Sequence, residues 1–140
     1  PKGDHAGNTS ALGQTIDISR TVLERAGVKP YWGIQGTSIL GDITGGQATD
    51  REALLIEDDR QRINLGFTRF QKIRTLITEQ YRFTMGYPDA RDELYDLKAD
   101  PGELNNLWES EPELRAQLTD QLTRMILEYQ DPTPLATAVA

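Results

Sequence analysis

The sequence predicts an α+β fold in which a small antiparallel sheet of about four strands is covered by a C-terminal amphipathic helix. Two patterns predict the sheet: residues 81–85 alternate apolar with polar side chains, and residues 53–57 form an apolar run of strand length. A third pattern predicts the cover, because apolar residues near the C-terminus recur at helical spacing and form one stripe. The stripe consists of Leu114, Leu118, Leu122, Met125, Ile126 and Tyr129.

Composition limits the possible functions. The 140 residues include 15 basic and 22 acidic side chains, and the net charge of −7 argues against a nucleic-acid partner. There is no cysteine, so disulfides and thiolate metal sites are excluded within the chain. No run approaches the roughly 20 apolar residues of a membrane span, so we expect no membrane partner. The chain opens with a proline and no initiator methionine, so we expect it to be part of a longer protein; the sequence does not indicate a compartment.

Residues 1–14 are rich in Gly, Ser, Asn and Asp, which predicts an irregular lead-in. Asp4 and His5 are adjacent there and could suggest a metal site. A single histidine without carboxylates at ligand spacing favours a solvated loop instead.

A helix is predicted over residues 17–26. We expect Asp17 to cap its N-terminus, an interpretation favoured over a catalytic carboxylate, and Gly27 to end it in a left-handed conformation. Its predicted apolar face contains Ile18, Val22, Leu23 and Ala26.

Residues 28–46 are predicted as a long coil, because they contain five glycines and no regular apolar period. A coil of this length usually wraps over a larger surface. We expect this coil and the helix before it to pack on a domain outside this chain, which requires that Trp32 and Ile39 are not fully buried within the chain alone.

A hairpin is predicted over residues 71–86, followed by a strand over 93–97. We expect Asp100 to cap a short helical turn, with Glu103 reaching back to it. This turn is predicted to deliver Leu104 and Leu107 to the core.

The last helix is predicted to begin with a capping box formed by Ser110 and Glu113, with Pro112 in its first turn. Its stripe could bind a partner, but the interpretation that it covers the sheet is favoured. Residues 132–140 are expected to form a tail.

Three stretches, in order, resemble the C-terminal part of the sulfatase family, within the alkaline phosphatase superfamily. Residues 93–107, ELYDLKADPGELNNL, resemble the family's last strand and the turn after it. Residues 17–27, DISRTVLERAG, followed by GTSIL at 36–40, resemble an upstream helix and coil. Residues 74–83, RTLITEQYRF, resemble a hairpin of the family.

The resemblance implies a division of the chain. Residues 1–50 would be the end of the catalytic domain, residues 51–131 the C-terminal sulfatase subdomain, and residues 132–140 a tail. In such enzymes the nucleophile is a formylglycine made from a Cys/Ser-x-Pro/Ala-x-Arg motif, and a divalent cation, calcium, lies in a carboxylate cage. The sequence contains no match to that motif, so we predict no catalytic residue and no metal ligand in this chain. Formylglycine and calcium are expected in the parent enzyme.

One charged cluster could contact substrate. Asp58, Arg60 and Arg62 follow the strand predicted over 53–57, and a guanidinium matches the oxygens of a sulfate ester. An exposed loop with compensating charges is the favoured alternative.

Two functions therefore stay open. The chain is predicted to be the non-catalytic C-terminal part of a sulfatase-like hydrolase, buttressing a catalytic domain and lining its substrate cleft. The alternative is a stand-alone interaction or oligomerisation module without enzymatic activity. A homo-oligomer is possible under both.

Overall fold

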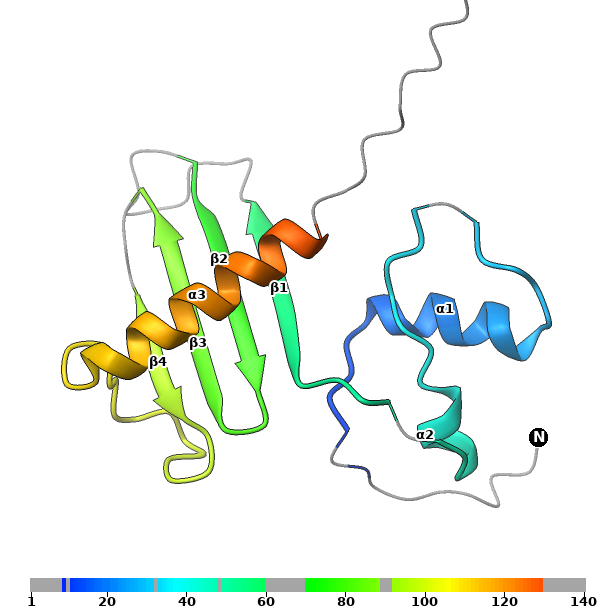
Figure 1. Cartoon of the computed structure of the whole chain (residues 1–140), viewed down its shortest axis with the longest axis horizontal. Coiled ribbons are helices and arrows are strands. Elements are labelled where there is room, and N and C mark those ends of the chain that lie inside the picture. The colour runs from blue at the N-terminus through cyan, green and yellow to red at the C-terminus, as the bar shows by residue number, and fades with distance from the viewer. Residues whose placement is uncertain are drawn as a thin grey trace, which may run out of the picture.

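The computed structural model describes residues 9, 11–31, 33–47, 49–59, 70–88 and 92–129. Two short helices come first, followed by four strands and one long helix (Figure 1). The elements are α1 (Ile16–Arg25), α2 (Leu40–Thr44), β1 (Ala53–Asp59), β2 (Lys72–Thr78), β3 (Tyr81–Tyr87), β4 (Glu93–Asp96) and α3 (Pro112–Tyr129).

The four strands form one antiparallel sheet in the order β1-β2-β3-β4. Leu55, Leu76, Phe83 and Leu94 lie in register across it and therefore share one face. The helix α3 crosses this face diagonally (Figure 1). The α+β class, the four-stranded sheet and its helical cover are confirmed.

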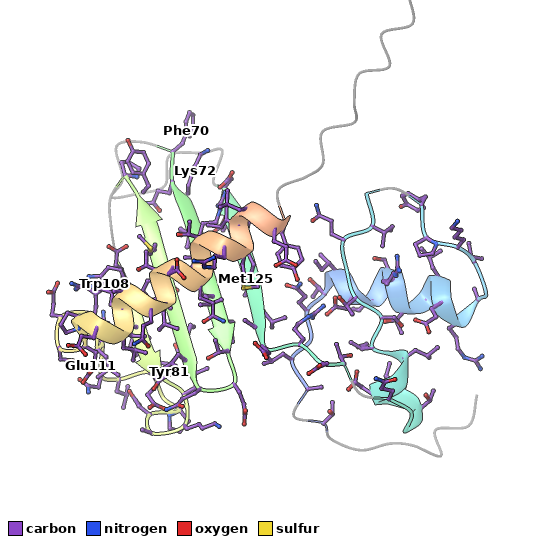
Figure 2. The ribbon with its side chains drawn as sticks, viewed as in Figure 1. Phe70, Lys72, Tyr81, Trp108, Glu111 and Met125 are labelled. Atoms are coloured by element: carbon purple, nitrogen blue, oxygen red, sulfur yellow. The ribbon has the colours of Figure 1, made fainter. Side chains whose placement is uncertain are left out.

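The core lies between α3 and this face of the sheet. Leu118 and Leu122 of α3 are buried against Leu76, Phe83 and Leu94. The ring of Trp108 stacks on Phe83 with their centroids 5.3 Å apart. Figure 2 shows Trp108 and Met125 toward the two ends of this interface. The predicted stripe is confirmed except at its end, where Tyr129 is 43% exposed.

The segment between β4 and α3 differs from its prediction. Asp100 does accept backbone hydrogen bonds, from the N–H groups of Leu104 and Asn105, but the chain makes turns there and no helix begins. Glu103 has φ 53°, outside the helical region, and its carboxylate binds Arg82. Leu104 is 90% exposed, whereas Leu107 packs against the core as predicted.

The start of α3 also differs. Ser110 lies two residues before Pro112, and its hydroxyl donates to the carbonyl oxygen of Leu107 instead of capping the helix. The predicted capping box is therefore wrong.

Two further boundaries are corrected. The strand β1 continues to Asp59, so Asp58 and Asp59 belong to the sheet and not to a loop. The coil predicted over residues 28–46 contains the short helix α2.

Some predictions fall on residues that the structure does not describe: Asp4, His5, Trp32 and the tail over 132–140. Ile39, which is described, is only half-buried.

Candidate functional site

A buried ion pair joins α1 to the segment that leads into β1. The guanidinium of Arg51 donates to both carboxylate oxygens of Asp17, from Nη1 to Oδ2 at 2.6 Å and from Nη2 to Oδ1 at 2.9 Å. The Asp17 side chain is fully buried and that of Arg51 is 10% exposed. The backbone N–H groups of Gln14 and Thr37 donate to the same carboxylate.

These contacts correct the prediction that Asp17 caps a helix. The helix α1 begins at Ile16, so Asp17 lies in its first turn. Burial by itself raises the pKa of Asp17, but the hydrogen bonds from Arg51, Gln14 and Thr37 stabilise the charged form and hold the pKa below its ordinary value. No local sequence pattern indicates Arg51 as the partner of Asp17, because the two residues lie 34 positions apart.

The buried face of α1 is polar. Thr21, one turn after Asp17, donates its hydroxyl proton to the carbonyl oxygen of Asp17 at 2.7 Å and accepts from the N–H of Ile39 at 3.0 Å. The chain passes close to α1 at Gly36, where a Cβ atom would lie 2.2 Å from the carbonyl oxygen of Ile16. Only glycine permits this approach.

The predicted apolar face of α1 is largely exposed. Ile18 is 58% exposed and Val22 is 60% exposed. Ile16, at the start of α1, is exposed as well, and the segments that follow α1 add the exposed side chains of Val28, Tyr31 and Ile43. We call this set the α1 apolar surface. Such a surface is typical of a site that another polypeptide covers.

A groove separates α1 from the sheet. It has a volume of about 560 Å³ and follows β1 from Ala53 to Glu57. One wall consists of residues 13–16, which precede and begin α1, together with Gln35 and Thr37. Arg51, Ile77, Met125 and Tyr129 complete the lining. The groove is therefore largely apolar on the sheet side and more polar on the α1 side.

The predicted substrate-contact residues are only partly described. Asp58 lies in β1, half-buried, while Arg60 and Arg62 lie outside the described residues. Both acidic neighbours of Asp58 bind Arg74 of β2: its Nε is 2.8 Å from Glu57 and its Nη1 is 2.7 Å from Asp59. This contact lowers the pKa of Asp59. Sequence reasoning missed Arg74 because its position opposite Glu57 depends on strand register.

A second charged cluster lies on the sheet face opposite α3. Arg82 contacts Glu103 at 2.5 Å and Glu93 at 3.2 Å, and its guanidinium lies 5.0 Å from the ring centroid of Tyr95. These contacts tie the segment after β4 to the sheet. Across the described part of the chain, no three His, Cys, Asp or Glu side chains are placed to hold a metal ion. None of the described helices is both long and apolar enough to cross a membrane.

Comparison with known families is decisive for the assignment. The sequence matches a family described as "N-sulphoglucosamine sulphohydrolase, C-terminal" over residues 1–131. The chain belongs to this family. The predicted resemblance to the C-terminal portion of a sulfatase is thereby confirmed.

A curated relative of this sulfatase C-terminal chain supports the assignment. An N-acetylglucosamine-6-O-sulfatase from Bacteroides thetaiotaomicron is 30% identical over 141 residues, a match that covers 96% of this chain and 25% of that protein. The sulfatase C-terminal chain thus spans about a quarter of the length of this relative.

Solved structures share the fold. A phosphonate monoester hydrolase from Silicibacter pomeroyi has a TM-score of 0.74 at 22% identity, covering 88% of this chain and 26% of its own. A structure determined with its substrate D-glucosamine-2-N,6-O-disulfate has a TM-score of 0.65 at 25% identity, covering 84% of this chain and 24% of its own. A 2-O glycosaminoglycan sulfatase has a TM-score of 0.67 at 21% identity, and the match covers 80% of this chain and 24% of that sulfatase.

Proposed function

We propose that this chain is the non-catalytic C-terminal part of a sulfatase-like hydrolase that cleaves sulfate esters. Its role is to buttress the catalytic domain and to help line the substrate cleft. The observation that carries the proposal is the match to the sulphohydrolase C-terminal family over residues 1–131, in a chain that spans only a quarter of its curated relative.

The division of labour follows from the chemistry of the side chains. The sequence contains no Cys/Ser-x-Pro/Ala-x-Arg motif, so the formylglycine nucleophile is assigned to the catalytic domain. The calcium ion is assigned there as well. Residues 51–131 form the C-terminal subdomain, and residues 1–50 belong to the end of the catalytic domain.

The α1 apolar surface supports this boundary. The helix α1 buries Asp17 and Thr21, whose polar groups are satisfied within the chain, and the described residues leave its Ile18 and Val22 exposed. Burying a large apolar side chain stabilises a protein by about 1.5–3 kcal/mol. The catalytic domain is the proposed cover.

The substrate is proposed to be a sulfated amino sugar. The curated relative is named an N-acetylglucosamine-6-O-sulfatase, and one structural neighbour was solved with D-glucosamine-2-N,6-O-disulfate. Arg60 and Arg62, with Asp58, stay the candidates for substrate contact, because a guanidinium fork matches the oxygens of a sulfate group.

The test is to express the chain together with the polypeptide that its gene encodes upstream; we call this the longer protein. We expect that upstream polypeptide to contain the formylglycine motif and carboxylate metal ligands. With calcium, the longer protein should hydrolyse a 6-O-sulfated glucosamine, while the 140-residue chain should not. The matched control replaces the motif Cys or Ser by alanine. Lack of the motif, or sulfatase activity in the 140-residue chain, would contradict the proposal.

A further inference from the structure

We propose that the outer edge of β1 pairs with one extended segment of the catalytic domain, which adds a fifth strand to the sheet. This inference rests on the proposed function and deepens it, because it names the place where the two domains are joined. It concerns the backbone of Ala53, Leu55 and Glu57 in β1.

The orientation of these backbone groups follows from the opposite edge of the sheet. On β4, the N–H of Leu94 donates to Oδ1 of Asn106 at 3.0 Å, and its carbonyl oxygen accepts from the N–H of Leu107 at 2.8 Å. The backbone groups of Leu94 therefore point away from β3. In an antiparallel pair, residues opposite each other direct these groups either toward each other or away from each other.

Strand register carries this orientation across the sheet. Leu94 lies opposite Phe83, Phe83 opposite Leu76, and Leu76 opposite Leu55. Since the backbone N–H and C=O groups of Leu94 point away from β3, those of Phe83 point toward Leu76. Phe83 and Leu76 therefore form a hydrogen-bonded pair. The backbone groups of Leu76 are thus directed away from β1. Those of its partner Leu55 are in turn directed away from β2 and into the groove.

The alternation along a strand extends the result to its neighbours. Ala53 and Glu57 direct their N–H and C=O groups outward with Leu55, while Leu54 and Ile56 pair with β2. Within the described residues, no hydrogen bond from another segment reaches these outward groups. The two edges of the sheet therefore differ: β4 is covered by residues 106–107, whereas none of the described segments covers the β1 edge.

The open edge has the character of a pairing site. Exposed edge strands are usually protected by charged side chains, proline or a bulge, and on β1 the charged side chains begin only at Glu57. The segment from Ala53 to Ile56 has none of these, and Ile56 is 43% exposed. The groove runs beside this same segment and is lined by consecutive residues of β1, hence by both of its faces. An added strand would find backbone partners and apolar side chains together.

The size of the groove favours a single strand as its occupant. A volume of about 560 Å³ is in the range of roughly 300–1,000 Å³ that holds a small ligand. It suits a few residues of one extended segment. Residues 13–16 form its far wall, so the polypeptide preceding α1 already runs beside it.

Charge specifies the occupant further. Glu57 and Asp59, at one end of the edge, have side chains that are 50% and 52% exposed. The segment should carry a basic residue at that end and apolar residues beside Leu54, Leu55 and Ile56. Relatives are about four times as long as the matched region, so they contain ample polypeptide to supply such a strand.

Residue-resolved hydrogen exchange tests the proposal. In the 140-residue chain, the amides of Ala53, Leu55 and Glu57 should exchange rapidly, while those of Leu54 and Ile56 are protected. In the longer protein, protection of the outward three should rise about a hundredfold or more. The amide of Leu94, already bonded to Asn106, is the internal control and should be protected in both.

Two results would overturn the proposal. The first is rapid exchange of the three amides in a longer protein that hydrolyses sulfate esters, which would leave the proposed function standing. The second is protection of the three amides in the 140-residue chain together with a dimeric mass in sedimentation, which would identify a second copy as the occupant.

Paired substitutions at Glu57 give an independent measurement. Glu57→Pro removes the outward N–H, whereas Glu57→Ala removes only the side chain that contacts Arg74. We expect the two variants to have equal Tm in the 140-residue chain. In the longer protein, Glu57→Pro should have the lower Tm, and equal Tm values there would contradict the pairing.

Discussion

Asp17 and Arg51 form a two-pronged ion pair between residues 34 positions apart, with a shortest distance of 2.6 Å and no exposure of the carboxylate. This contact connects α1 to the entry of β1. The Arg51 guanidinium balances the charge of the buried Asp17 carboxylate. Without Arg51, this carboxylate would be buried with no countercharge.

Replacement of Arg51 by methionine tests this dependence. We expect a loss of about 3–5 kcal/mol in the free energy of unfolding, because the Asp17 carboxylate stays buried without its partner. Urea unfolding followed by circular dichroism measures it. The control is Arg124→Met, which breaks an exposed pair with Asp120 and should cost less than about 1 kcal/mol. Equal losses of unfolding free energy in the two variants would contradict the prediction that the buried ion pair contributes more than the exposed one.

The same pair predicts a pH dependence. The pKa of Asp17 is lower in the folded chain than its ordinary value of 3.8, so its contribution is complete above that value. The contribution is lost as the pH falls through the lower, folded pKa. Unfolding free energies measured from pH 6 down to pH 2.5 should therefore decline more steeply in the wild type than in Asp17→Asn. Parallel declines would show that Asp17 does not contribute.

Two leucines of α3 test the placement of the core. Leu118 is 5% exposed and Leu127 is 65% exposed. Leu118→Ala should lower the free energy of unfolding by about 2–5 kcal/mol, because it leaves a cavity above the sheet. Leu127→Ala should change it by less than about 0.5 kcal/mol. Thermal or urea unfolding of both variants measures the two changes. A larger loss for Leu127→Ala than for Leu118→Ala would show that the buried face of α3 is wrongly assigned.

Two glycines test the close approach of the chain to α1. A Cβ atom at Gly36 would lie 2.2 Å from the backbone oxygen of Ile16, while at Gly13 it would meet nothing within 4 Å. Gly36→Ala should destabilise the chain by about 1–3 kcal/mol through overpacking. Gly13→Ala should be tolerated. Tolerance of both substitutions in urea unfolding would mean that the segment moves away from α1 at little cost.

The α1 apolar surface makes a prediction about docking. Val22→Lys should leave the Tm of the 140-residue chain almost unchanged, because Val22 is 60% exposed there. In the longer protein it should lower the Tm, since a lysine would be buried at the interface. Leu127→Lys, on the exposed side of α3, is the control. An unchanged Tm of Val22→Lys in the longer protein would show that Val22 of α1 does not lie in the interface.

Sequence patterns were sufficient to predict the elements that depend on local side-chain spacing. The alternation over residues 81–85 and the stripe from Leu114 to Ile126 predicted the hairpin and its helical cover, because side-chain period depends only on backbone geometry. The motif at residues 93–107 indicated the family for the same reason: its order along the chain is visible without a fold. The substrate-contact residues stay a prediction, since Arg60 and Arg62 lie outside the described part.

Long-range packing determines which face of α1 is buried and which charged side chains form ion pairs. Helical period identifies an apolar face at Ile18 and Val22, but it does not say whether this chain covers that face. Asp17 and Arg51 are distant in sequence, and Arg74 reaches Glu57 through strand register. The open edge of β1 follows from a register that spans all four strands. Contacts between distant residues are set by how elements pack, and no local pattern encodes them.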